Sequence, residues 1–397
     1  MADVDFPEPD VTPETIEPAT LKARIDAGDA VTILDVRMGS EYEAWHIDGE
    51  SVETINVPYY EFLDDDIGDD IFASLPEDEQ ITVVCAKGEA SEYIAGVLSE
   101  KGYDAENVTE GMNGWASIYE AVEVQGYDGP GTVFQYQRPS SGCLGYLVVD
   151  GNEAAVIDPL RAFTDRYLDD AEAHGADLVY ALDTHVHADH VSGIRTLAEA
   201  GVEAVLPAPA IDRGVEDAEE LTAGENGDVF TVGSVEIEAI HTPGHTTGMT
   251  SYLVGESLLA TGDGLFVESV ARPDLEAGDE GAEDAAKQLY ETLQERILSL
   301  PAEVLIAGGH TSEAAEPAAD GTYTAPLGEL GEEMDALSMN EADFVQVVLA
   351  DMPPRPANYE DIIATNLGQN PIDDEEAFTL ELGPNNCAAS QESLAGD

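Results

Sequence analysis

The stretch THVHADH, residues 184–190, places three histidines and an aspartate in seven positions. It follows DLVYAL (177–182), which is typical of a buried strand, and precedes VSGIRTLAEAG (191–201), which is typical of a helix. The loop is therefore expected at the carboxyl end of a strand, where open α/β sheets place their sites. Side chains two positions apart in an extended segment point to one side, so His185 and His187 can face a common centre. Four candidate ligands in one loop indicate a metal site.

Further candidate ligands follow strand-like runs downstream. They are His241 in AIHTPGHTTG, Asp263 in LATGDGLF and His310 in LIAGGH. This series resembles the metallo-β-lactamase superfamily, whose pattern is HxHxDH followed by His, Asp and His. The resemblance covers roughly residues 131–370. It implies an αββα sandwich with the metal site at one edge of two facing sheets.

The charge of the chain is strongly negative: 14 basic residues stand against 84 acidic ones, which gives a formal net charge of −70. Such a surface repels nucleic acid and anionic membranes, so we expect neither as a partner. The carboxylates are spread along the whole chain, and 43% of the residues are hydrophobic. We therefore expect a folded, halophilic protein whose self-repulsion is screened in molar salt, where the Debye length is about 3 Å.

The cysteine count and the apolar runs indicate a cytoplasmic protein. Three cysteines (85, 143 and 387) in 397 residues exclude a disulfide scaffold and suit a reducing compartment. The first residues, MADVDFPEPD, do not form a signal peptide pattern. No stretch approaches the roughly 18 apolar residues that span a bilayer.

The alternation of apolar runs and helical stretches predicts an α/β protein with two domains. In the first domain short strands alternate with helices, which is typical of a parallel sheet. After EVQGYDGPG (123–131) the strand-like runs come closer together, and short helices end the chain. The expected division is an acidic N-terminal segment (1–15), a first domain (16–125), a linker (126–131), a second domain (132–370) and an acidic, frayed tail (371–397).

The segment ITVVCAKGEASEYIAG (81–96) places Cys85 after a strand and before a helix. Backbone amides in such a loop, together with the helix dipole, favour a thiolate and can hold an anion. The loop resembles the CxxGxxS loop of the rhodanese family, with Cys85, Gly88 and Ser91. LDVR, EYEAWHIDG, NVPY and GMNGW match other rhodanese segments in order, so the resemblance covers residues 15–125. It implies a rhodanese-like parallel-sheet domain in which Cys85 carries sulfane sulfur.

Two departures from the rhodanese pattern leave an inactive domain as the alternative. Trp45 replaces the usual glycine before His46, and Ala90 replaces an arginine that is common late in the loop. The only cation of the loop is Lys87, so we expect Lys87, Gly88 and Ser91 to form the substrate-binding groups around the sulfur.

Features near the end of the second domain are similar to the persulfide dioxygenases, the branch of the superfamily with one iron. SVARPDL (269–275) is similar to their GRPDL-like segment, and ADFVQVVLADMPPRP followed by Tyr359 and Asn366 resembles their helical end. The resemblance implies one Fe²⁺ per chain, a thiol persulfide and O2 as substrates, and sulfite as the product. Sulfane-sulfur transfer by the rhodanese domain would connect this product with thiosulfate.

The resemblance also assigns site residues. It implies that His185, His241 and Asp263 hold the iron and that Arg272 binds substrate, although a surface ion pair is an equal alternative for Arg272. The remaining groups would orient the ligands and move protons: His187, Asp189, His190 and His310.

The same ligand series leaves two other functions open. In a two-zinc thioester hydrolase of the glyoxalase II kind, Asp263 would bridge two Zn²⁺ ions. The ions would be held by His185, His187 and His241 on one side and Asp189, His190 and His310 on the other. A non-catalytic sulfur or metal sensor is the second alternative. The sequence does not identify the thiol carrier, and it leaves the oligomeric state open, a homo-oligomer included.

Overall fold

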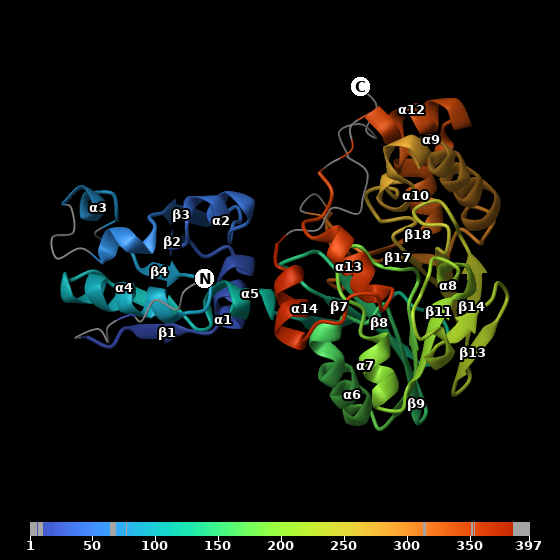
Figure 1. Cartoon of the computed structure of the whole chain (residues 1–397), viewed down its shortest axis with the longest axis horizontal. Coiled ribbons are helices and arrows are strands. Elements are labelled where there is room, and N and C mark those ends of the chain that lie inside the picture. Colours follow the sequence, from blue (N-terminus) through green and yellow to red (C-terminus); the bar gives the residue numbers. More distant parts are fainter. Residues whose placement is uncertain are drawn as a thin grey trace. The chain divides into compact units, whose positions relative to one another are not determined.

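The computed structural model describes residues 6, 11–63, 69–76, 78–312, 315–350, 352 and 354–383. The chain divides into two compact units, Met1–Ile118 and Tyr119–Asp397 (Figure 1). Cys387 and most of the expected 1–15 segment lie outside the described residues. Among the described residues, no helix combines the length and apolar character that a bilayer crossing requires.

The first unit contains a five-stranded parallel sheet in the order β1-β5-β4-β2-β3. Its strands are β1 (Glu14–Ile16), β2 (Val31–Asp35), β3 (Val52–Asn56), β4 (Ile81–Val84) and β5 (Ala105–Val108). Its helices are α1 (Pro18–Asp26), α2 (Gly39–Ala44), α3 (Asp69–Ala73), α4 (Glu89–Glu100) and α5 (Gly111–Ala116). Ile33 packs with side chains of α1 and α5, while Leu34 packs with side chains of α4. Both faces of the sheet are therefore buried, which explains the continuous apolar strands.

The second unit contains two sheets that pack face to face. The seven-stranded sheet has the order β12-β11-β10-β9-β8-β7-β6, and the six-stranded sheet has the order β13-β14-β15-β16-β17-β18. The strands of the first are β6 (Glu120–Glu123), β7 (Thr132–Gln137), β8 (Leu144–Asp150), β9 (Glu153–Ile157), β10 (Asp177–Leu182), β11 (Glu203–Pro207) and β12 (Thr222–Gly224). The strands of the second are β13 (Val229–Val232), β14 (Val235–His241), β15 (Thr250–Val254), β16 (Leu258–Gly262), β17 (Leu305–Gly308) and β18 (Thr324–Pro326). Between them lies a core with side chains from both sheets, among them Val148 and Tyr252.

Helices cover the outer faces of both sheets (Figure 1). The seven-stranded sheet is covered by α6 (Thr164–Ala173), α7 (Ile194–Glu199) and α8 (Ala208–Ile211). The six-stranded sheet is covered by α9 (Asp274–Thr292), α10 (Leu327–Glu333), α11 (Asp335–Ser338) and α12 (Glu341–Ala350). Two further helices, α13 (Tyr359–Asn366) and α14 (Asp374–Leu380), form a short C-terminal extension. The predicted fold class, a parallel-sheet domain followed by an αββα sandwich, is confirmed.

Two of the expected domain boundaries are wrong. The units meet at Ile118 and Tyr119, and β6 pairs with β7 in the sheet of the second unit. The segment 126–131 is therefore the connection between two paired strands and not a linker between domains. At the other end, α14 and the buried Glu381 lie within the expected frayed tail, so its first part is folded.

Candidate metal centre and sulfur site

The loop that joins β10 to α7, residues 183–193, is held in place by Asp158 at the end of β9. We call it the metal loop. The Thr184 amide and hydroxyl donate to the two Asp158 carboxylate oxygens at 2.7 and 2.9 Å. The Thr184 hydroxyl oxygen lies 2.9 Å from Nδ1 of His185. Because this hydroxyl donates to Asp158, Nδ1 of His185 must donate to it, which leaves a lone pair on Nε2.

A second imidazole is oriented in the same way. Nδ1 of His245 lies 2.9 Å from the backbone carbonyl oxygen of Arg272. A carbonyl only accepts hydrogen bonds, so Nδ1 of His245 is protonated and Nε2 again carries a lone pair. Second contacts of this kind are typical of histidines that bind metals.

These two nitrogens converge on one carboxylate oxygen. Nε2 of His185 and Nε2 of His245 each lie 3.6 Å from Oδ2 of Asp263. All three atoms are buried, and none has a hydrogen-bond partner among the described residues. Atoms bound to one ion at about 2.1 Å are roughly 3 to 3.5 Å apart, so the observed spacing suits a single ion. The donor set fits Fe(II), which is held in many oxygenases by two histidines and one carboxylate.

The protonation states of the three side chains suit a metal as well. Burial lowers the pKa of His185 far below its usual value, and burial also lowers the pKa of His245. Burial alone raises the pKa of Asp263, but the neighbouring His310 outweighs it, and the pKa lies below its usual value. At neutral pH the site therefore presents two neutral imidazoles and one carboxylate, the forms that bind metals.

The structure does not bring His241, the predicted third ligand, to this group. His241 is the last residue of β14, and its Nε2 lies 2.9 Å from the backbone carbonyl oxygen of Thr247. The segment after β14 then turns back and carries His245 to Asp263. Both histidines stand in the quoted AIHTPGHTTG, and the Pro-Gly pair before His245 was the signal for such a turn.

The other four predicted residues surround the three-residue group. His310 joins two carboxylates: its Nδ1 lies 2.9 Å from Oδ1 of Asp263, and its Nε2 lies 2.9 Å from Oδ2 of Asp189. Nδ1 of His190 lies 2.6 Å from the same Asp189 oxygen. His187 turns its Nε2 to Asp158, at 3.2 Å. The structure thus brings these four side chains together beside the three ligand atoms, and adds Asp158, whose role sequence reasoning missed.

The end of β16 must lie very close to the metal loop to place Asp263. Gly262 has a positive φ of 48°, and a Cβ atom at this position would lie 2.3 Å from the Thr184 hydroxyl oxygen. Only glycine fits this approach. The backbone of Thr250 in β15 contacts the loop too, because its amide donates to the Thr184 carbonyl at 2.9 Å.

Cys143 lies just before β8 and packs against this network. Its Sγ is buried and lies 3.4 Å from Oδ2 of Asp189 and 3.5 Å from Nε2 of His310. Burial raises the pKa of this thiol, but the nearby His310 outweighs it, and the pKa is lowered to about 7.

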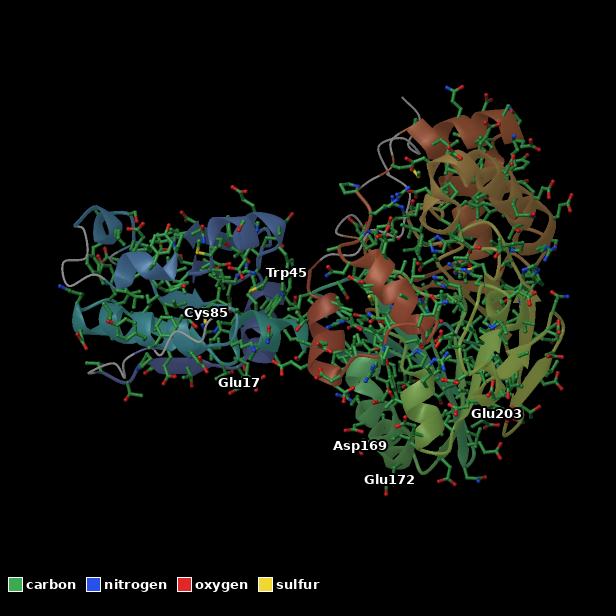
Figure 2. All side chains as sticks on the ribbon, viewed as in Figure 1. Glu17, Trp45, Cys85, Asp169, Glu172 and Glu203 are labelled. Carbon is green, nitrogen blue, oxygen red and sulfur yellow. The ribbon has the colours of Figure 1, made fainter. Side chains whose placement is uncertain are left out.

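In the first unit, Cys85 follows β4 and lies at the start of a tight loop (Figure 2). Its Sγ accepts hydrogen bonds from the Gly88 amide and from the Ser91 hydroxyl, each at 3.1 Å. Gly111 closes the loop from the other side, because a Cβ atom there would lie 2.1 Å from the Cys85 carbonyl oxygen. The structure thus brings Cys85, Gly88 and Ser91 together as predicted, while the side chain of Lys87 is exposed.

Comparison with known proteins finds a family match for the part of the chain with the metal centre and another for the part with Cys85. The family model of the metallo-beta-lactamase superfamily matches residues 140–310, and that of the rhodanese-like domain matches residues 17–118. Mouse mitochondrial persulfide dioxygenase ETHE1 is 33% identical over 181 residues, which cover 44% of this chain and 66% of that protein. The bovine protein of the same name is 30% identical over 189 residues, covering 47% of this chain and 70% of that protein. The crystal structure of ETHE1 from Myxococcus xanthus is 26% identical with a TM-score of 0.51, covering 59% of this chain and 98% of that one.

The chain belongs to the metallo-β-lactamase superfamily, in its persulfide dioxygenase type. A rhodanese-like domain precedes the metallo-β-lactamase domain, as the sequence predicted. The match spans 66% of the length of the mouse protein and 70% of the length of the bovine protein.

Within the metallo-β-lactamase domain, Arg272 has a structural position. Its guanidinium is buried and donates to both carboxylate oxygens of Asp274, at 2.8 and 3.0 Å, and to the Pro354 carbonyl oxygen at 3.0 Å. Its own carbonyl orients His245. The structure therefore does not support the predicted substrate contact of this side chain, and the alternative of a surface ion pair is wrong because the pair is buried.

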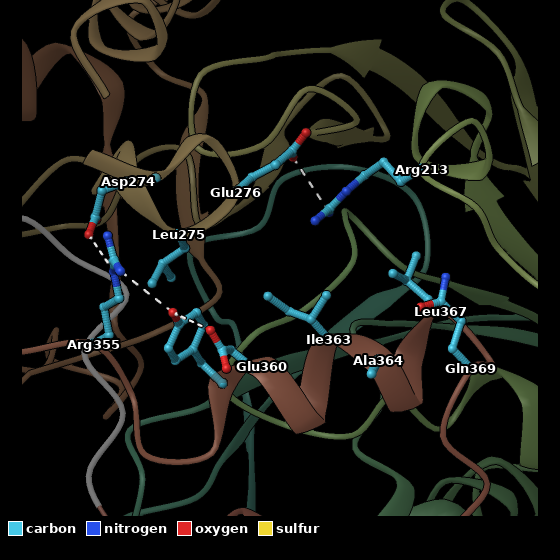
Figure 3. A pocket seen from close by; sticks show the side chains of 12 residues that line it. Arg213, Asp274, Leu275, Glu276, Arg355, Glu360, Ile363, Ala364, Leu367 and Gln369 are labelled. Atoms are coloured by element: carbon cyan, nitrogen blue, oxygen red, sulfur yellow. Dashed lines mark hydrogen bonds and ion pairs between the residues drawn. The ribbon is translucent and has the colours of Figure 1, made fainter. Parts of the chain in front are cut away.

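A cavity of about 430 Å³ lies between the start of α9 and helix α13 of the metallo-β-lactamase domain (Figure 3). Oppositely charged side chains pair across its lining: Arg213 lies 3.5 Å from Glu276, and Arg355 lies 2.9 Å from Asp274. Leu275, which also lines the cavity, packs in one cluster with Ala188 of the metal loop. The cavity is therefore a neighbour of the metal loop.

Proposed function

We propose that the protein is a persulfide dioxygenase that uses one Fe²⁺ per chain, held by His185, His245 and Asp263. The observation that carries this proposal is the convergence of three buried, unpartnered ligand atoms on one point. The reaction converts R–S–SH, O2 and H2O into R–SH, SO3²⁻ and two protons, in which the outer sulfur is oxidised and dioxygen is reduced. When bound, the iron would supply adjacent positions at which sulfur and dioxygen can meet.

The residues around the three ligands would set their orientation and accept protons. His310 fixes Asp263 through Oδ1, which leaves Oδ2 for the metal. From Asp263 a hydrogen-bonded series runs through His310 to Asp189 and on to His190. Since the reaction releases two protons, we assign proton transfer to this series.

The electrostatic surroundings of His187 and His190 differ from those of His185 and His245. Burial lowers the pKa values of both His187 and His190, but the contacts with Asp158 and Asp189 outweigh it, and both pKa values are raised. A protonated imidazole does not bind a metal. In the metal-free protein His187 and His190 therefore hold a proton more readily than His185 and His245, whose pKa values are lowered.

We place the thiol carrier of the persulfide in the cavity beside the metal loop. Because the arginines of its lining pair with Asp274 and Glu276, the cavity offers charges of both signs. A small carrier with both an ammonium and a carboxylate group fits such a lining better than a multiply charged anion.

The rhodanese-like domain would transfer sulfane sulfur through Cys85. In this step the Cys85 persulfide gives its outer sulfur to sulfite, the S–S bond breaks, and thiosulfate and the Cys85 thiolate result. The hydrogen bonds from Gly88 and Ser91 support the thiolate that is released. Thiosulfate is thus the second product that we assign to this protein.

We further infer that the protein works in the cytoplasm of a salt-adapted cell. Its acidic side chains include the exposed Asp169, Glu172 and Glu203 (Figure 2). Repulsion among such groups is screened in molar salt. A reducing compartment would keep Cys85 and Cys143 as the thiols seen here.

The test is oxygen consumption with a low-molecular-weight thiol persulfide in molar KCl. We expect the iron-loaded protein to consume one O2 for each molecule of sulfite or thiosulfate formed and the zinc-loaded protein to consume none. Absence of oxygen consumption by the iron form, together with thioester hydrolysis by the zinc form, would overturn the proposal.

A two-zinc thioester hydrolase is the second candidate, and one observation favours it. Nδ1 of His187 and Nε2 of His190 are buried and have no hydrogen-bond partner among the described residues. In this reading they would help to hold two Zn²⁺ ions, with Asp263 between them. Two zinc ions per chain in the protein as purified would support the hydrolase.

A further inference from the structure

The side chain of Asn366, at the end of α13, binds the backbone of the metal loop at three points. Its Nδ2 donates to the carbonyl oxygens of His187 and His190 at 2.9 and 2.8 Å. Its Oδ1 accepts a hydrogen bond from the Ser192 amide at 2.9 Å. One amide side chain thus supports both ends of the segment that contains Asp189.

A second residue of the C-terminal extension binds the same loop. Oε1 of Glu381 accepts a hydrogen bond from the Val191 amide at 2.7 Å. Its Oε2 accepts one from Nη1 of Arg138 at 2.6 Å, and both charged side chains are fully buried. The guanidinium of Arg138 in turn lies between the rings of Phe163 and Phe378.

We propose that residues 359–381, the C-terminal clamp, hold the metal loop in its metal-binding conformation, with Asn366 and Glu381 as positioning residues. The carbonyls of His187 and His190 accept hydrogen bonds from the clamp, and the amides of Val191 and Ser192 donate hydrogen bonds to it. Leaving a buried backbone group without a hydrogen-bond partner is unfavourable. The loop conformation seen here is therefore maintained from outside the loop.

The residues that the clamp contacts lie a few positions after His185 in the metal loop. Asp189 fixes His310, and His310 fixes Asp263, so a displaced loop would disturb two of the three ligands. Loss of contacts that orient metal ligands commonly weakens metal binding 10- to 100-fold. Helix α13 also lines the cavity with Tyr359 and Ile363, so the same helix faces the proposed carrier site and the metal loop.

The alternative is that Asn366 contributes only to general packing. The rate of metal release distinguishes this alternative from a role in positioning the metal loop. The variant is Asn366→Ala, and the matched control is Asn370→Ala, because Asn370 is also half-buried but bonds to Thr365 within the extension. Both variants and the full-length wild type are loaded with Fe²⁺ or Co²⁺ in molar KCl. The rate of metal release to an excess of chelator is measured beside the melting temperature of the metal-free protein.

We expect N366A to release the metal at least tenfold faster than the wild type, while N370A releases it at the wild-type rate. Metal-free N366A should melt at a somewhat lower temperature than N370A, because it loses three hydrogen bonds, so the release rates are compared at a temperature at which both variants are folded. If N366A does not fold, Asn366→Asp has the same shape and carries the same expectation, because it loses both donated hydrogen bonds. Equal release rates for wild type and N366A, or equally accelerated release in N370A, would overturn the proposal.

This inference and the proposed function can fail separately. A wild type that binds metal but consumes no oxygen would contradict the dioxygenase proposal and would not affect the proposal of a C-terminal clamp. If N366A releases metal and consumes oxygen at the wild-type rates, the proposal of a C-terminal clamp is contradicted and the dioxygenase proposal is not.

Discussion

Nε2 of His245 lies 3.6 Å from Oδ2 of Asp263, although the two residues are 18 positions apart in the sequence and belong to different connections of the six-stranded sheet. His241, four residues before His245, ends β14 and bonds to the Thr247 carbonyl instead. The turn after β14 therefore decides which histidine reaches the centre. Glu276 stabilises this turn, because its carboxylate accepts hydrogen bonds from the Thr247 amide and hydroxyl at 2.9 and 2.6 Å.

A substitution at the sulfur site should distinguish the proposed activity of the rhodanese-like domain from that of the metallo-β-lactamase domain. Replacing Cys85 with serine should abolish thiosulfate formation from a persulfide and sulfite and leave oxygen consumption unchanged. Ser91→Ala removes one of the two hydrogen bonds to the sulfur and should slow transfer about ten- to a hundredfold, since a hydrogen bond to a charged group contributes about 1.5 to 3 kcal/mol. Oxygen consumption and thiosulfate formation are measured on the same samples. If C85S still forms thiosulfate at the wild-type rate, the rhodanese-like domain has no catalytic role.

The buried ion pair between Arg138 and Glu381 predicts a large loss of stability on Glu381→Gln. Glutamine keeps the shape but leaves the buried guanidinium uncompensated, which costs about 3 to 5 kcal/mol. The control is Glu283→Gln, which removes an exposed pair with Lys287 and should leave unfolding nearly unchanged. Denaturant unfolding at constant molar salt measures both. Similar small effects in the two variants would mean that the buried pair does not stabilise the fold.

Much of the fold could be predicted because its signals are local. The apolar run at 177–182 coincides with β10, and Tyr359 and Asn366 of the expected helical end are the first and last residues of α13. Strands that follow a two-residue period or that are buried on both faces show a recognisable sequence pattern within a few residues. The short polar β6 does not: its sequence is EAVE, and it is a strand because β7 lies beside it.

In the candidate site, too, some residues could be recognised from the neighbouring sequence, while others depend on contacts between residues far apart in the chain. The HxHxDH loop, Asp263 and His310 stand directly after strands and were found from that position. The choice between His241 and His245 depended on the path of the turn between β14 and β15. The contact of Glu381 with Arg138 joins residues 243 positions apart, which no short pattern can indicate.

The buried Asp274 predicts a specific dependence of stability on pH. Burial raises the pKa of this carboxyl group, but its hydrogen bonds with Arg272 and Arg355 outweigh it and lower the pKa. The stabilisation is therefore complete above the unfolded-state pKa of about 3.9 and is lost as the pH falls through the lower pKa of the folded state.

The test compares wild type and Asp274→Asn. We expect the wild type to be more stable at pH 7 and the difference between the two free energies of unfolding to shrink below about pH 4. Taking the difference removes the titration of the other carboxylates. A difference that stays constant from pH 7 to pH 3 would contradict this account of Asp274.

The account as a whole depends on which side chains hold the metal and on how many ions are bound. Elemental analysis of protein purified anaerobically without added metal addresses both points, on wild type, His245→Ala and His241→Ala. We predict one iron per chain in the wild type and in H241A, and almost none in H245A. Two zinc ions per wild-type chain, or loss of iron from H241A with retention in H245A, would contradict the central claim.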